Sequence, residues 1–167
     1  MTRAASIALR ARRHGARHAL RIVREARRAG LQPALALALV ERESDFRNVF
    51  GNDPVRSPQV RGEPVTRDGY LRYRELRDRG HGAQGVGLTQ LTWPSFQAEA
   101  DSIGGCWKTR TQLRVGFRVL ADHIRARGER DGVAAYNGRG PGAQRYADDV
   151  LRLAARWERL LATEDRM

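Results

Sequence analysis

Two acidic residues, Glu41 and Glu43, come directly after residues 34–40, a stretch that contains only Ala, Leu and Val. A helix over this stretch brings residues three, four and seven apart onto one face, so that Glu43 follows Val40 and Ala36 on an apolar face. A helix that is apolar on all sides is typical of a protein interior, where desolvation raises the pKa of a carboxyl group. A carboxylic acid that stays protonated near neutral pH can act as a general acid. The alternative is that both glutamates face water at the end of a helix.

Three later segments carry polar side chains that could surround such an acid. Their sequences are Gly-Val-Gly-Leu-Thr-Gln-Leu-Thr, Ala-Ala-Tyr-Asn-Gly and Tyr-Ala-Asp-Asp-Val, at residues 85–92, 134–138 and 146–150. In this order and spacing, after an apolar helix that ends in Glu-Ser, they resemble the lysozyme-like transglycosylase family and the goose-type lysozymes. The resemblance covers residues 31–160. It is closest to the glycosidase domain of actinobacteriophage endolysins, in which Glu-Ser-x-Phe-x-Asn-Val-Phe-Gly-x-Asp precedes Gln-Gly-Val-Gly-x-x-Gln-Leu-Thr-Trp.

This resemblance implies a phage endolysin that degrades the bacterial cell wall by cleaving the β-1,4 bond between N-acetylmuramic acid and N-acetylglucosamine. Glu43 is then the general acid, because it is the glutamate that Ser follows. The residues implied to contact the substrate or to support the acid are Ser44, Gln90, Tyr136, Asn137 and Tyr146. Tyr146 resembles the family tyrosine that contacts the catalytic glutamate, so its hydroxyl would orient Glu43. For Gln90 and Asn137 the alternative is a role in turn-forming hydrogen bonds.

A second carboxylate would decide which reaction takes place. An inverting hydrolase needs a base that activates water, and the candidates are Asp45, Asp53 and Asp78. Asp53 matches the Gly-x-Asp of the endolysin segment, whereas Asp78 resembles an acidic position of goose-type lysozymes but is followed by two extra residues. The family's acidic position after the glycine-rich turn is Thr92 here, which is not a base. A lytic transglycosylase needs no second carboxylate, because the 6-hydroxyl of the substrate attacks to give a 1,6-anhydro product, and both reactions remain open.

The periodicity of the chain predicts a single, mostly α domain, and the resemblance implies an α+β lysozyme-like fold. The helix that carries Glu43 is expected to begin at Pro33. Residues 47–65 lack helical periodicity and contain several Gly and Pro, so a small irregular or β region is expected there. Further helices are expected from Thr66 to Arg79, from Pro94 to Gly104, from Thr109 to Gly128 and from Ala143 onward.

Positive charge is concentrated at the N-terminus. The net charge of the 167-residue chain is +12, and residues 1–30 hold nine arginines against one acid, Glu25, which is a net charge of +8. Apolar residues recur between the arginines from Arg17 to Ala29, which predicts a basic amphipathic helix. We expect residues 1–30 to form a basic arm that contacts anionic cell-wall polymers, ahead of a catalytic domain at residues 31–162. Alternatives for this helix are contact with a membrane or nucleic acid, or simple docking on the domain.

Several kinds of site and segment are not expected. Cys106 is the only cysteine, so no disulfide within the chain and no cysteine-based metal site can form, and we expect no metal or cofactor. No apolar stretch is long enough to span a membrane, and arginines interrupt the N-terminus where a signal peptide would need an apolar core. We therefore expect a monomer that stays in the host cytoplasm before release and then acts on peptidoglycan glycan strands. The resemblance implies a separate holin that opens the membrane.

Two other functions are compatible with the composition. A basic nucleic-acid-binding protein would explain the charge. However, the chain contains no zinc finger, RNP-type motif or basic zipper, so nucleic acid is not an expected partner. An inactive wall-binding or virion module with the same fold would keep the motifs without the reaction, and fold alone does not separate it from an enzyme.

Overall fold

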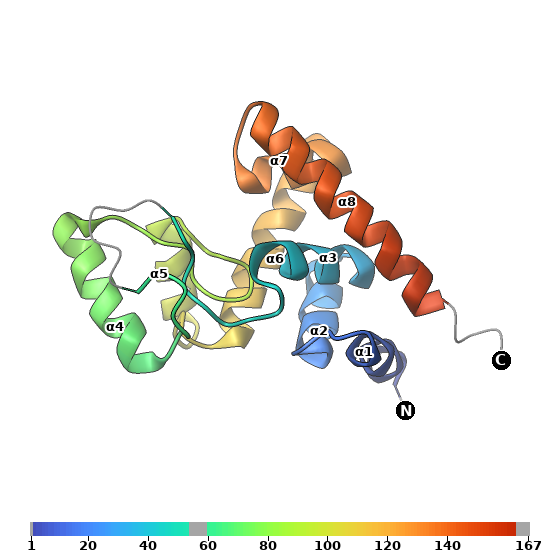
Figure 1. The fold of residues 1–167 in the computed structure, drawn as a ribbon, viewed down its shortest axis with the longest axis horizontal. Coiled ribbons are helices and arrows are strands. Elements are labelled where there is room, and N and C mark those ends of the chain that lie inside the picture. The colour runs from blue at the N-terminus through green and yellow to red at the C-terminus, as the bar shows by residue number, and fades with distance from the viewer. Residues whose placement is uncertain (1, 54–59, 163–167) are drawn as a thin grey trace. The chain divides into compact units, whose positions relative to one another are not determined.

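The chain is mostly helical in the computed structural model, which describes residues 2–53 and 60–162 (Figure 1). Within these residues the α-helices are α1 (Arg3–Arg13), α2 (Ala19–Ala29), α3 (Pro33–Ser44), α4 (Arg67–Leu76), α5 (Pro94–Ser102), α6 (Thr109–Arg127), α7 (Glu129–Asn137) and α8 (Pro141–Ala162). A π-helical turn, η1 (Arg77–His81), follows α4 directly. The prediction of a mostly α chain is therefore confirmed.

Two compact units make up the chain. The first, here called the helical unit, combines residues 1–42 with residues 117–167, and the second, here called the turn unit, is formed by residues 43–116. The chain passes from one unit to the other inside α3 and returns inside α6. Glu43 is therefore the first residue of the turn unit, whereas Glu41 belongs to the helical unit.

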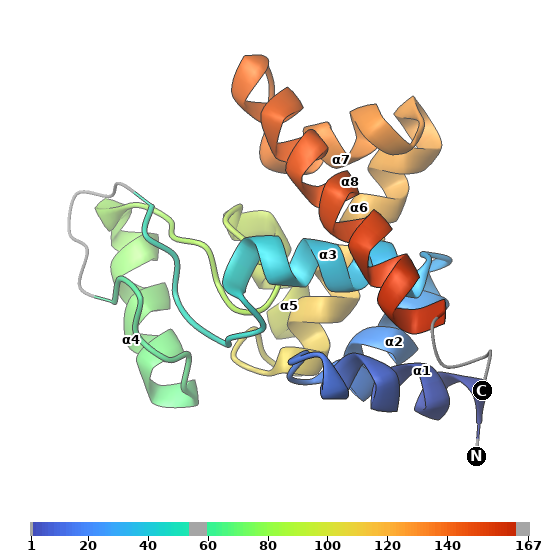
Figure 2. The same cartoon turned by 45° about the vertical axis from the view of Figure 1, so that its right-hand side comes forward.

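Helix packing forms the helical unit. α1 contacts α2 and α8, and α7 lies alongside α8 (Figure 2). The predicted basic helix is present as α2, which ends at Gly30 in a left-handed conformation, as a glycine C-cap does. α1 is an additional helix whose buried residues are all alanines, namely Ala4, Ala8 and Ala11. α1 and α2 thus pack against each other, and α1 also packs against α8.

α3 is formed by the apolar stretch identified in the sequence. Pro33 occupies its first position, where the missing N–H costs nothing, and all residues from 34 to 40 are buried. The prediction of a helix buried on all sides is confirmed. The helix ends at Ser44, so both glutamates lie in its last turn.

Loops and short contacts dominate the first part of the turn unit. Two isolated antiparallel bridges join Val49 to Pro64 and Phe50 to Val86, in the region expected to be irregular or β. Residues 54–59 of that region lie outside the described residues. Thr66 caps α4 by accepting a hydrogen bond from the N–H of Gly69 at 3.0 Å, as predicted. The expected continuation to Arg79 is π-helical rather than α-helical.

The part of the chain that the structure describes contains no helix with both the length and the apolar character needed to cross a bilayer.

Candidate active site

The end of α3 is attached to the glycine-rich turn, residues 85–92. Ser44 is buried, and its Oγ donates a hydrogen bond to the carbonyl oxygen of Leu88 at 3.0 Å. Glu43, one residue earlier, is partly buried. The candidate acid is therefore joined to a residue that fixes the helix end to the turn, and a side-chain contact of this kind restricts the orientation of its neighbours.

The backbone reverses directly after Ser44 through two non-glycine residues in the left-handed region. Asp45 has φ 50° and Phe46 has φ 59°. Such a conformation costs roughly 1–2 kcal/mol for each residue that carries a Cβ, so the surrounding structure must hold it in place. The N–H of Arg47 donates to the carbonyl oxygen of Ser44 at 3.0 Å, which closes this reversal. The chain immediately after the candidate acid is thus a tight turn.

A buried glutamine holds the glycine-rich turn from inside. The Oε1 of Gln112 accepts the N–H of Leu88 at 3.0 Å, and its Nε2 donates to the Oδ1 of Asn48 at 2.9 Å and to the carbonyl oxygen of Cys106 at 2.8 Å. Gly87 has φ +78°, and a Cβ there would lie 2.0 Å from the Gln112 side chain. A glycine is therefore required for this close approach.

Gln90, a predicted cleft residue, bonds to backbone both within the glycine-rich turn and in the segment that follows α3. Its Nε2 donates to the carbonyl oxygens of Val49 at 2.9 Å and Gly87 at 2.8 Å. A Cβ on Gly51 would lie 2.5 Å from both the Oε1 of Gln90 and the Oδ2 of Asp53, so these three residues are brought together. These contacts match the alternative role considered for Gln90, the shaping of the turn.

Two of the three candidate bases, Asp53 and Asp78, are placed differently. Asp53 is partly buried, and its Oδ2 accepts the N–H of Gly85 at 2.8 Å, which attaches it to the glycine-rich turn. Asp78 lies in η1 with a side chain that is 61% exposed, and its Oδ1 pairs with Arg77 at 2.8 Å. Asp53 is therefore attached to the glycine-rich turn that contains Gln90, whereas Asp78 is a surface residue paired with Arg77.

Glu41 connects α3 to α8 through hydrogen bonds. Its carboxylate accepts hydrogen bonds from the guanidinium of Arg156 at 2.6 and 2.7 Å and from the indole Nε1 of Trp157 at 2.7 Å. Trp157 is fully buried, and α8 carries both partners. Through these bonds the Glu41 side chain acts as an acceptor that joins α3 to α8.

The remaining predicted residues belong to the helical unit. Tyr146 is buried in α8, and the guanidinium of Arg42 lies 5.2 Å from the centre of its ring. Tyr136 is partly buried and Asn137 is exposed, both at the C-terminal end of α7. The structure therefore brings Tyr146 under Arg42, while the expected hydrogen bond from Tyr146 to Glu43 stays a prediction.

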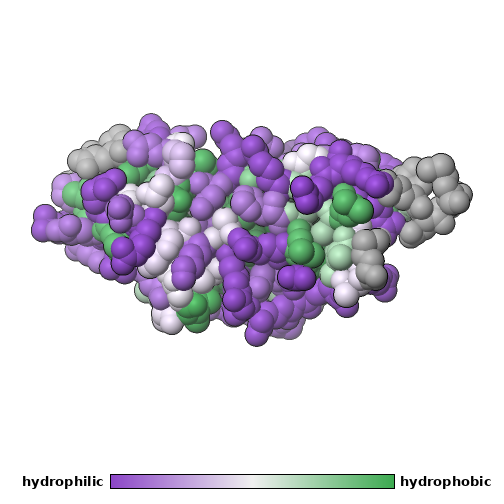
Figure 3. Space-filling view, turned by 90° about the horizontal axis from the view of Figure 1, so that it is seen from below, coloured by the Kyte–Doolittle hydropathy of each residue, from purple (hydrophilic) through white to green (hydrophobic). Residues whose placement is uncertain are grey.

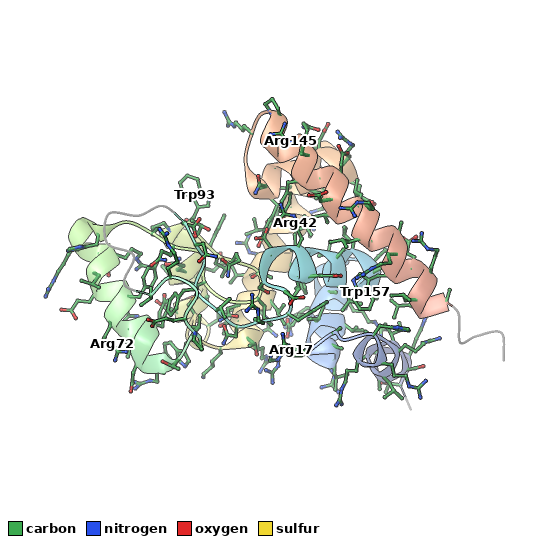
Figure 4. All side chains as sticks on the ribbon, viewed as in Figure 1. Arg17, Arg42, Arg72, Trp93, Arg145 and Trp157 are labelled. Carbon is green, nitrogen blue, oxygen red and sulfur yellow. The ribbon has the colours of Figure 1, made fainter. Side chains whose placement is uncertain are left out.

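Trp93 is a candidate binding residue that the sequence analysis did not single out. It is 70% exposed and projects outward from its segment (Figure 4). Its backbone is fixed, because its carbonyl oxygen accepts the N–H groups of Phe96 and Gln97 at 3.0 and 3.1 Å at the start of α5. The signal in the sequence is its position directly after the Gln-Leu-Thr of the glycine-rich turn. It lies five positions after Leu88, so the two Cα atoms are at most about 18 Å apart.

Other reactive groups are not arranged for chemistry. Cys106 is fully buried, and burial together with Asp101 raises the pKa of its thiol to about 12, so it carries no thiolate at neutral pH. Among the described residues, no group of three His, Cys, Asp or Glu side chains is arranged to hold a metal ion.

Comparison with known proteins adds no assignment: no family model matches this chain, and no curated protein matches it.

Proposed function

We propose that the protein is a peptidoglycan glycosidase that cleaves the β-1,4 bond between N-acetylmuramic acid and N-acetylglucosamine, with Glu43 as the general acid. The observation that supports this assignment most directly is the difference between the two glutamates of α3. Glu41 is occupied by Arg156 and Trp157, whereas Glu43 is followed by the anchored Ser44 at the glycine-rich turn. A carboxyl group at the anchored end of an apolar helix is a setting that suits general acid catalysis.

The proposed reaction begins when the protonated carboxyl group of Glu43 donates its proton to the glycosidic oxygen. The bond from that oxygen to C1 of the muramic acid residue breaks, and an oxocarbenium-like transition state forms. In the transglycosylase version the 6-hydroxyl of the same sugar attacks C1, and the Glu43 carboxylate takes the hydroxyl proton. In the hydrolase version a second carboxylate takes a proton from the water that attacks C1.

Asp53 is the better candidate for that second carboxylate. It is held on the turn by the N–H of Gly85, which gives it a fixed position in the turn unit that also contains Glu43. Asp78, by contrast, is largely exposed and paired with Arg77. If the protein is a hydrolase, exchange of Asp53 by Asn should therefore cost more activity than exchange of Asp78 by Asn.

Trp93 is the proposed sugar platform of this site. Aromatic rings with one open face stack on the apolar side of sugar rings, and binding sites for small molecules commonly combine such rings with a few polar groups. Trp93 combines an exposed ring with a fixed backbone, so little conformational freedom is lost on binding. Gln90 shapes the turn that precedes Trp93 in the sequence. The roles of Tyr136 and Asn137 in substrate binding, and of Tyr146 in orienting Glu43, are proposed from the family resemblance alone.

Digestion of purified peptidoglycan, followed by mass spectrometry of the released sugars, tests the proposal. The wild-type protein, Glu43→Gln and the matched control Glu41→Gln are compared. We expect products from the wild type and the control but not from Glu43→Gln. Anhydro products would establish a lytic transglycosylase, and reducing ends would establish a muramidase. Absence of products from the folded wild type, or equal product from Glu43→Gln, would contradict the assignment.

The biological setting that we propose is that of a phage endolysin. Such a protein accumulates in the host cytoplasm and reaches the wall after a holin has opened the membrane. Lysis of bacteria from outside by the purified protein, but not by Glu43→Gln, would support this role. A protein that binds walls without releasing sugars would instead be a wall-binding module.

A further inference from the structure

The outward faces of α1 and α2 combine arginines with exposed leucines. In α2, Ile22, Val23 and Ala26 are buried, and the residues on the opposite side are exposed. α1 has the same arrangement, with alanines inside. We call the outward residues the arginine face, which consists of Leu9, Arg12, Leu20, Arg24, Arg27 and Arg28.

Within the described part of residues 1–30, a single acid accompanies nine arginines. The only acid among residues 1–30 is Glu25, which is buried in α2. Partial desolvation, together with the nearby Arg21 and Arg17, lowers the pKa of His18, as expected where positive charge is dense. Among the residues that the structure describes, the guanidinium groups of four arginines of this face make no hydrogen bond or ion pair: Arg12, Arg24, Arg27 and Arg28. Their guanidinium groups are available for external anions.

The leucines make the face more than a simple cationic patch. Four large apolar side chains are exposed among the described residues, and two of them, Leu9 at 43% and Leu20 at 37%, lie on this face. Figure 3, a view from below, shows green hydrophobic surface beside purple hydrophilic surface on the side where α1 and α2 lie. Nucleic acids and wall polymers would bind the arginines but would leave both leucines in water. A lipid interface accommodates both, because phosphates lie above acyl chains.

We propose that the arginine face binds the surface of anionic phospholipid bilayers. The arginines contact the lipid phosphates, and Leu9 and Leu20 enter the boundary between headgroups and acyl chains. α1 and α2 lie on the membrane and do not cross it. The proposal does not depend on the glycosidase activity, since no residue of the candidate active site belongs to this face.

Co-sedimentation with vesicles tests the proposal. The vesicles contain phosphatidylglycerol and phosphatidylcholine in equal parts, and vesicles of phosphatidylcholine alone are the lipid control. The charge variant is Arg24→Gln/Arg27→Gln/Arg28→Gln, and the apolar variant is Leu9→Gln/Leu20→Gln, which keeps the charge. The matched control removes three exposed arginines elsewhere, as Arg72→Gln/Arg139→Gln/Arg145→Gln. Circular dichroism verifies that each variant is folded.

We expect the wild type to bind the anionic vesicles only. The charge variant should bind roughly tenfold more weakly or worse, the apolar variant should bind severalfold more weakly, and the matched control should bind nearly as well as the wild type. Equal losses in the charge variant and the matched control would overturn the assignment to α2. Unchanged binding by the apolar variant would overturn the lipid assignment and leave a general contact with polyanions such as wall polymers or nucleic acid.

Discussion

The helical unit and the turn unit are stabilised by different kinds of contact. In the helical unit, apolar stripes pack against each other, and several ion pairs join exposed side chains, such as Arg130 with Asp148 and Arg152 with Asp149. In the turn unit, uncharged polar side chains are buried and bond to loop backbone. Six of the seven buried polar residues among those described lie there: Ser44, Gln84, Thr89, Gln97, Thr111 and Gln112.

This difference has a consequence for how each unit responds to mutation. Surface ion pairs contribute little to stability, so the helical unit should tolerate polar substitutions on its surface. A buried amide that loses its partner leaves several backbone groups unsatisfied at once, and each costs about 1–3 kcal/mol. The turn unit should therefore be sensitive at a few polar positions and glycines, which are also the positions around the candidate active site.

The largest expected effect is the difference in activity between substitutions of the two glutamates of α3. Glu43→Gln should lower turnover of peptidoglycan roughly 10²- to 10⁴-fold with little change in stability, because the amide cannot donate the catalytic proton. Glu41→Gln should lower the free energy of unfolding by about 1–2 kcal/mol and keep most activity, because it weakens the bonds to Arg156 and Trp157. Product release and urea unfolding measure the two quantities. The reverse pattern, with activity lost only at position 41, would refute the assignment.

The next prediction compares the loss of stability when one glycine in each unit is replaced by alanine. Gly87→Ala should lower the free energy of unfolding by about 3–4 kcal/mol, because the new Cβ meets the Gln112 side chain in addition to the positive φ. Gly140→Ala in the helical unit has a similar φ of +84° but no atom within 4 Å, so we expect about 1–2 kcal/mol. Urea unfolding followed by circular dichroism compares the two. Equal losses would mean that the approach of Gln112 is not what requires glycine at position 87.

A third comparison removes one glutamine from each unit. Gln112→Leu should cost about 2–3 kcal/mol of stability, because the N–H of Leu88 and the side chain of Asn48 lose their partner. Gln144→Leu removes only a surface contact with Arg130 and should change stability by less than about 0.5 kcal/mol. Thermal unfolding of both variants is the measurement. A loss of stability in Gln144→Leu as large as that in Gln112→Leu would contradict the expected difference between the two units.

The smallest expected effect concerns substrate binding at the surface of the turn unit. Trp93→Ala should raise KM for glycan fragments roughly threefold to tenfold with unchanged stability, since the ring is exposed and contributes little to the core. Trp93→Phe should restore most of the affinity, because a smaller aromatic ring still stacks. A KM that does not respond to either substitution would remove Trp93 from the proposed site.

Local patterns predicted much of the fold. The unbroken apolar run predicted that α3 is buried, the apolar residues that recur between the arginines from Arg17 to Ala29 predicted α2, and Thr66 predicted a helix start. α1 escaped the pattern because its buried stripe consists only of alanines, which are common on both sides of helices. These elements depend on residues that are neighbours in the sequence, and a single sequence therefore contains the information needed to predict them.

The candidate site was less predictable for a physical reason. The hydrogen bond from Gln112 to Asn48 joins residues 64 positions apart, and the pairing of Glu41 with Arg156 joins residues 115 positions apart. Such contacts cannot be predicted from local periodicity, because their partners are far apart in the sequence. The left-handed turn at Asp45 and Phe46 contains no glycine, so the usual sequence signal for that conformation is missing.

The pairing of Glu41 with α8 also determines the order in which the chain can fold during synthesis. The turn unit is continuous in the sequence and can complete its contacts once residue 116 has left the ribosome. The carboxylate of Glu41 must wait for Arg156, 115 residues later, which takes roughly 6–23 s at about 5–20 residues per second. During that interval the apolar α3 lacks its partner helix. We therefore expect the nascent chain to expose α3 until α8 has been synthesised, and to depend on chaperones mainly during that interval.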